Sequence, residues 1–212
     1  MKPVKTWGGL TAVFFLALTA GCATKPAVIR EKAGQEPTNY SHAVRLARCG
    51  VERWSVKTGT DPDAPSVDLR RPEQETVEYL TSVPKQSPLP SDNRLRPTET
   101  TEYVVDATLV GYKLESKDSD YHLVIQGGDG QTMIVEIPAP ACVGPNSPFA
   151  AEIKNARDEF DLAYHATTTY KRVSVPVRVR GVGFFDFNHG QTGVSKTNAI
   201  ELHPVLDILF NP

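Results

Sequence analysis

Residues 103–137 read YVVDATLVGYKLESKDSDYHLVIQGGDGQTMIVEI, and this stretch decides the fold. Apolar residues alternate with other residues in three runs, which is the pattern of strands that bury one face. The polar segments 117–120 and 127–130 separate the runs and carry the Asp, Ser and Gly typical of turns. The stretch therefore predicts three consecutive strands joined by short turns.

The next segment has the period of a helix. Four apolar residues recur at spacings of four, three and four, which places them on one helical face: Phe149, Ile153, Ala156 and Phe160. We expect Ser147 to cap this helix and Pro148 to occupy its first position.

Alternation returns after residue 165. Residues 173–180 predict a strand in which Pro176 lies at an edge or bulge, where its missing N–H is tolerated. The loop 188–193 leads to a last strand over residues 199–210, which we expect to break near Pro204.

The expected element order is three strands, one helix and two strands. This is the order of an OB-fold, a five-stranded and partly open barrel. The predicted fold class is therefore mainly β with one main helix, an OB-fold-like barrel over residues 99–212. An open α+β sandwich of the same elements is the alternative.

The N-terminus has the features of a secretory signal. Lys2 and Lys5 precede an apolar run over residues 10–18, and small residues follow it. The run is too short to span a bilayer, which takes about 20 residues. Residues 18–22, LTAGC, resemble the lipobox of bacterial lipoproteins, although Thr19 stands where Leu is commoner.

The lipobox resemblance implies a location. It implies cleavage before Cys22, acylation of that cysteine by chains such as palmitate, and anchoring to a bacterial membrane. Ala23 follows the cysteine, and in Gram-negative members of the family the absence of Asp there implies the outer membrane, facing the periplasm. A secretory signal with a chance cysteine is the alternative.

The chain divides into four parts. Residues 1–21 are the expected signal peptide, 22–41 a flexible tether, and 42–98 an irregular N-terminal extension packed on the barrel domain, 99–212. Within the extension we expect three short elements: a helix at 41–47, an extended segment at 52–57 and a helix at 72–80.

Cysteine content agrees with export. Once Cys22 is acylated, Cys49 and Cys142 remain, an even number in an oxidising compartment. We predict a disulfide between them; two buried free thiols are the alternative.

One candidate polar site lies near the C-terminus. Asp186, His189, Glu201 and His203 carry donors that could bind a metal or act as acid and base. Their spacing matches no known ligand pattern, so we expect no metal or cofactor. Hydrogen bonds that fix the 188–198 loop are the simpler interpretation.

A second candidate set lies around the first hairpin and comprises Asp118, Asp120, His122 and Glu136. Staphylococcal-type nucleases also place carboxylates on an OB-fold, together with arginines. The arginine-bearing motif is not recognisable here, and Asp118 and Asp120 are accounted for as turn residues.

A third candidate is a basic and aromatic face that would bind a saccharide or a single strand. Its members would be three basic and three aromatic residues: Lys113, Arg178, Arg180, Tyr112, Phe184 and Phe187. Aromatic residues in the core and solvated basic residues are the alternative.

Composition and motifs narrow the function. Acidic residues outnumber basic ones, 25 to 23, which argues against a protein that coats nucleic acid. No Ser-His-Asp set or nucleophile elbow is present, so we expect no enzyme. The segments DYHLVI, MIVEIPAPAC, VRGVGFFDFNHGQTGV and AIELHPVLDI resemble a group of uncharacterised bacterial proteins, which implies a common fold without an activity.

The leading expectation is a membrane-anchored envelope lipoprotein that acts as a non-enzymatic binding module for a protein or a cell-wall component. The alternatives are a phosphodiester hydrolase of the OB-fold nuclease type and a purely structural envelope protein. A cleft that holds several acidic groups with shifted pKa values would favour the hydrolase.

Overall fold

β-Strands dominate the structure, a computed structural model that describes residues 48–212. The expected signal peptide, Cys22, the tether and the helix at 41–47 lie outside the described residues. The strands are β1 Asp68–Glu75, β2 Thr101–Leu114, β3 Tyr121–Gln126, β4 Thr132–Ile137, β5 Lys171–Phe185 and β6 Ile200–Phe210. The helices are α1 Trp54–Thr58, α2 Val77–Ser82 and α3 Ala150–Ala163. None of these helices is long and apolar enough to cross a membrane.

The predicted three-strand meander is confirmed. β2 pairs with β3 and β3 with β4, both antiparallel and joined by the predicted turns. Side chains on one face, including Val105, Leu109, Leu123 and Ile125, are completely buried in the core. Alternation in the sequence thus identified both the strands and their core-facing side.

The six strands form one sheet in the order β1-β2-β3-β4-β6-β5, with an additional pairing between β2 and β5. β4 and β6 run parallel, whereas β5 is antiparallel to both β2 and β6. The chain is therefore mainly β with one main helix, as predicted, and β1 is a strand that the sequence pattern did not indicate.

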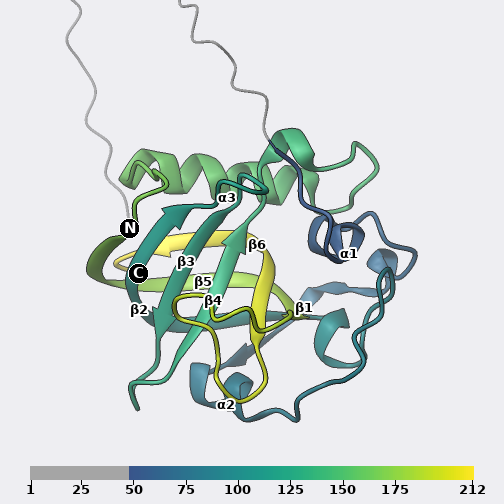
Figure 1. Ribbon diagram of the computed structural model, residues 1–212, viewed down its shortest axis with the longest axis horizontal. Helices are drawn as coiled ribbons and strands as arrows, with labels where there is room; N and C mark the ends of the chain where they lie inside the picture. Colours follow the sequence, from purple (N-terminus) through teal and green to yellow (C-terminus); the bar gives the residue numbers. More distant parts are fainter. Residues whose placement is uncertain (1–47) are drawn as a thin grey trace, which may run out of the picture. The chain divides into compact units, whose positions relative to one another are not determined.

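Helix α3 lies across one end of β2–β4 and packs against β4 and β6 (Figure 1). Its buried residues include Ile153, Ala156 and Phe160, as predicted. The helix begins two residues later than expected, because Phe149 occupies the N-cap position and Ser147 Oγ accepts a hydrogen bond from the Phe149 N–H at 3.2 Å.

Three local expectations were wrong. Residues 54–58 form helix α1, which is too short to show a helical period. Pro72 belongs to β1, an edge strand where its missing N–H is tolerated, and α2 begins only at Val77. β6 continues through Pro204 without a break, and its pairing with β5 shifts register at that point.

β3 and β4 are buried on both faces. His122, Val124 and Glu136 point away from the core residues, yet all three are buried. The 187–198 loop covers part of this outer face, since a Cβ at Gly193 would lie 2.4 Å from Val124 Cγ1. This cover encloses a cluster of polar side chains.

Candidate functional site

Seven ionisable side chains converge beneath the cover of β3 and β4. They come from α1, from the approach to β3, from β3 and β4, and from β5–β6 with its loop: Lys57, Asp120, His122, Glu136, Asp186, Glu201 and His203. Six of them belong to the two candidate sets that the sequence suggested separately. The structure joins those sets into one cluster.

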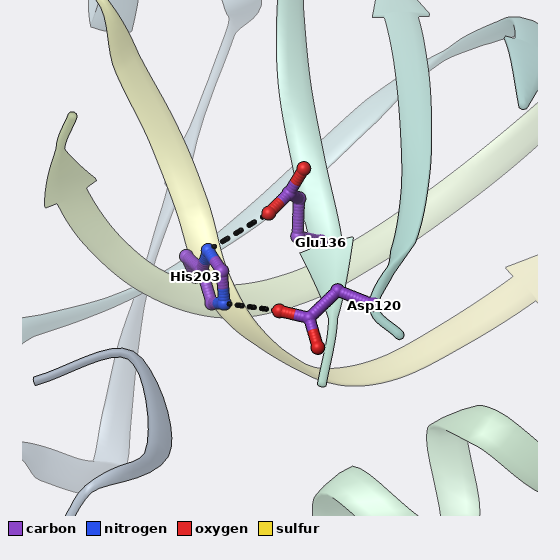
Figure 2. A group of neighbouring side chains, drawn as sticks. All are labelled: Asp120, Glu136 and His203. Carbon is purple, nitrogen blue, oxygen red and sulfur yellow. Dashed lines mark ion pairs between the residues drawn. The ribbon is translucent and has the colours of Figure 1, made fainter. Parts of the chain in front are cut away.

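His203 lies at the centre of the cluster and is fully buried. Its Nε2 is 3.3 Å from Asp120 Oδ2, and its Nδ1 is 3.3 Å from Glu136 Oε2 (Figure 2). Glu201 Oε2 approaches Nδ1 at 3.8 Å. Burial lowers the pKa of His203, but the surrounding carboxylates outweigh it and raise the pKa to about 9. The ring is therefore an imidazolium at neutral pH.

His122 is a second buried imidazolium. Nδ1 donates a hydrogen bond to Glu136 Oε1 and Nε2 donates one to the Thr192 carbonyl, both at 2.8 Å. A carbonyl and an ionised carboxylate only accept, so both ring nitrogens carry hydrogen. Burial lowers the pKa of His122, but the contact with Glu136 outweighs burial, so the pKa is raised above its usual value.

The carboxylates of the cluster have contrasting environments. Burial raises the pKa of Glu136, but His122, His203 and Lys57 outweigh it and lower the pKa to about 2. Burial and Asp186 raise the pKa of Glu201 to about 7. The pKa values of these two buried carboxyl groups are therefore shifted in opposite directions.

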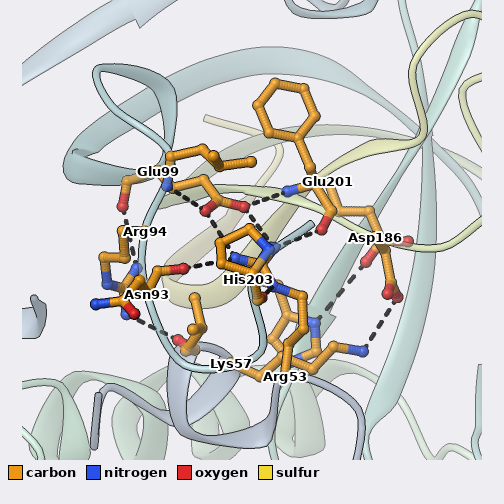
Figure 3. Close-up of polar contacts among 12 residues, drawn as sticks. Arg53, Lys57, Asn93, Arg94, Glu99, Asp186, Glu201 and His203 are labelled. Carbon is orange, nitrogen blue, oxygen red and sulfur yellow. Dashed lines mark hydrogen bonds and ion pairs between the residues drawn. The ribbon is translucent and has the colours of Figure 1, made fainter. Parts of the chain in front are cut away.

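Lys57 and Asp186 close the cluster on the α1 side. Lys57 Nζ lies 3.1 Å from Asp186 Oδ2 (Figure 3), and both side chains are almost completely buried. Burial lowers the pKa of Lys57, but Asp186, Glu136 and Glu201 together raise it above its usual value. The lysine is thus a fixed positive charge whose nearest partner is Asp186.

Several polar atoms of the cluster lack an aligned hydrogen bond. These atoms are Asp120 Oδ2, Glu201 Oε2 and both ring nitrogens of His203, and all are buried. They lie at ion-pair distance from one another without hydrogen-bond alignment. Leaving buried polar atoms without such partners costs free energy. The centre differs in this respect from the nearby pairs of Arg53 with Glu99 and of Arg94 with Asp61, which are hydrogen-bonded.

A cavity of about 540 Å³ lies over the cluster. Its walls come from residues 49–57, 115–122 and 186–191, and Glu136 also lines it. Five carboxylates and two lysines line the cavity. Acidic groups therefore outnumber the lysines on its wall.

The remaining sequence candidates lie around this cavity. Asp118 is on its wall, where burial raises the pKa of the carboxyl group. His189 lies at the exposed rim, with Nε2 3.1 Å from Glu52 Oε2. The loop carbonyl of Thr192 is bonded by His122, which does not belong to the C-terminal candidate set.

The basic and aromatic face is not assembled. Tyr112 and Phe184 are buried in the protein. Arg178 pairs with Asp106. Only Phe187 of the aromatic group is substantially exposed.

Two buried arginine pairs, which the sequence did not indicate, hold the N-terminal segment. Arg53 pairs with Glu99 at 2.7 Å (Figure 3). Arg94 pairs with Asp61 at 2.8 Å. Arg53 also donates to the Phe185 carbonyl at the end of β5. The paired residues are 46 and 33 positions apart in the sequence, so no local sequence pattern indicates these contacts.

Cys49 and Cys142 form a disulfide-compatible pair with Cα atoms 5.4 Å apart, inside the range of about 4.4–6.8 Å that a disulfide requires. Cys49 also lines the cavity.

In comparisons with known proteins, the chain matches no family model and no curated protein.

Proposed function

We propose that the chain is an exported lipoprotein, anchored through Cys22, whose folded part is an OB-fold-like barrel. The strand pairings support the barrel, because β2–β3–β4–β6–β5 returns through β5 to β2. In chain order these five strands are β2, β3, β4, β5 and β6. The helix α3 lies between the third, β4, and the fourth, β5, as in an OB-fold. The signal features and the disulfide-compatible cysteines support export.

The acid-lined cavity is the binding site in this proposal. Its volume of about 540 Å³ is within the usual range for small ligands. Carboxylates outnumber lysines on its wall, and Lys57 is already paired with Asp186. The cavity therefore favours a cationic group, and at an envelope surface the free amino groups of cell-wall peptides supply one.

Hydrolysis is the second candidate. Glu136 and Glu201 have pKa values shifted in opposite directions, and such contrasts accompany acid and base roles. A phosphodiester, however, needs cationic partners. Among the described residues no arginine lines the cavity, and Arg53 and Arg94 are committed to Glu99 and Asp61. Binding without chemistry is therefore the better-supported function.

Calorimetry with soluble peptidoglycan fragments tests the proposal. We expect fragments with free amines to bind and N-acetylated fragments to bind at least about tenfold more weakly, a loss of about 1.4 kcal/mol. Asp118→Asn on the cavity wall weakens binding, whereas Glu159→Gln on the exposed face of α3 does not. Equal binding of both fragment types, or no effect of Asp118→Asn, contradicts the amine site. Cleavage of a phosphodiester probe would favour the second candidate.

A further inference from the structure

Three buried side chains, one of which lines the cavity, bring possible metal ligands close together. Asp120, Glu136 and His203 each offer one ligand atom, and these atoms lie within 4.8 Å of one another. All three residues are buried. Two carboxylate oxygens and one imidazole nitrogen form a donor set that suits zinc, manganese and ferrous iron.

Both carboxylates are held in place by their other oxygen. Asp120 Oδ1 accepts the backbone N–H of Ala139 at 3.1 Å, and Glu136 Oε1 accepts a hydrogen bond from His122 at 2.8 Å. Each therefore presents its second oxygen toward His203, at 3.3 Å. Outer contacts of this kind orient the ligands of protein metal sites.

The atoms that face the centre are the ones that lack hydrogen bonds. Asp120 Oδ2 and both nitrogens of His203 are buried without an aligned partner, and so is Glu201 Oε2 beside Nδ1. A bound cation would satisfy the carboxylate oxygens and, once the imidazolium has released one proton, a single ring nitrogen of His203. When one ring nitrogen binds an ion, the other still faces a carboxylate, which fixes the orientation of the ring.

We propose that Asp120, Glu136 and His203 bind a divalent transition-metal ion, with Glu201 beside them as a further oxygen ligand. The ion would enter through the cavity, because Glu136 lines the cavity as well as the centre. Lys57 is the nearby competing cation, and its closest partner is Asp186 on the α1 side. The proposal goes beyond amine binding and does not depend on it.

Zinc binding to the untagged full-length protein, purified in mild detergent and stripped with a chelator, tests this site. We expect one zinc per chain by mass spectrometry after dialysis, and saturable binding in calorimetry. Asp120→Asn and Glu136→Gln should each weaken zinc binding by more than about 100-fold, since outer contacts alone are worth about 10- to 100-fold. Glu159→Gln, on the exposed face of α3, is the control and should leave the affinity unchanged.

A second control addresses adventitious zinc at the surface. His189 and Glu52 form an exposed pair at the rim, so loss of the stoichiometric zinc in His189→Gln would overturn the proposal. Less than about 0.2 zinc per wild-type chain would also overturn it and leave His203 as an imidazolium that only bridges carboxylates. The wild-type stoichiometry decides the question even if a buried variant fails to fold. Because no peptidoglycan fragment is present, the result is independent of the amine-binding test.

Discussion

At the residue scale, the site depends on two buried histidines whose ring nitrogens all face acceptors. His122 lies between Glu136 and a backbone carbonyl, and His203 lies between Asp120 and Glu136. Glu136 is thus shared by both rings. A buried carboxylate shared by two imidazolium groups stays ionised, which agrees with the lowered pKa of Glu136.

Tyr103 supplies a residue-scale prediction about alkaline stability. Burial raises the pKa of Tyr103 to about 12 from an ordinary value of 10.0. Because the folded pKa is the higher one, this contribution is fully present below pH 10 and is lost as the pH rises through 12. We expect the free energy of unfolding to fall over that range, with Tyr103 responsible for at most about 2–3 kcal/mol.

Urea unfolding at a series of pH values measures this effect. Tyr103→Phe keeps the ring but removes the titrating hydroxyl, so stability should decline less steeply above pH 10. Tyr79→Phe alters an exposed ring and serves as the control. Identical slopes for the Tyr103→Phe variant and the wild type would contradict the assignment.

The sequence identified most residues of the site but not their environment. Alternation correctly assigned His122 and Glu136 to the face opposite Leu123 and Val135, which would ordinarily be exposed. Their burial depends on cover from a segment about seventy residues away, as the bond from His122 to Thr192 shows. Local periodicity contains no information about such distant cover, and Lys57 was missed for the same reason.

At the element scale, buried ion pairs attach the irregular N-terminal segment to the strands. Glu99 accepts hydrogen bonds from Arg53, from the Leu95 N–H and from the Phe185 N–H. One carboxylate thus joins the segment that precedes β2 to the end of β5. The position of α1, which supplies Lys57 to the site, depends on this junction.

Glu99→Gln tests the junction. The substitution preserves size but leaves Arg53 as a buried charge without its partner, and breaking such a pair costs about 3–5 kcal/mol. We expect a loss of that size in urea unfolding. Asp106→Asn, which removes the exposed partner of Arg178, should change stability little. Comparable losses in the two variants would mean that burial of the pair is unimportant.

The cysteine pair supplies a second element-scale prediction. A bond between Cys49 and Cys142 would connect residues separated by 93 positions and would fix one wall of the cavity to the segment before α3. Replacing both cysteines by serine should cost about 2–5 kcal/mol. Titration of the purified exported protein should find no free thiol until a reductant is added. Two free thiols before reduction would contradict the bond.

Helices and strands were predicted correctly where the segment was long enough to show a hydrophobic period. The meander, α3 and both C-terminal strands had such periods, whereas α1 has five residues and β1 is an exposed edge strand. The exposed side chains of β1 show no alternation because neither face is buried. Its parallel pairing with β2 depends on tertiary contacts alone.

At the scale of the whole molecule, we propose that a lipid anchor holds the acid-lined cavity at a membrane surface. Cys22→Ser is the test of the anchor. Without acylation the protein should be found in soluble fractions or remain unprocessed, because two or more acyl chains are what hold such a protein firmly. A Cys22→Ser protein that still carries acyl chains and sediments with membranes would contradict the lipobox assignment.

The most direct test of the central claim is photo-crosslinking at two exposed apolar positions of the solubilised lipoprotein. Val51 lines the cavity and is 91 % exposed, whereas Leu162 lies on α3 and is 82 % exposed. A photoreactive residue at each position is irradiated with amine-bearing peptidoglycan fragments and analysed by mass spectrometry. The account predicts an adduct at position 51 that Asp118→Asn diminishes, and none at position 162. Equal adducts at both positions, or none at position 51, would contradict it.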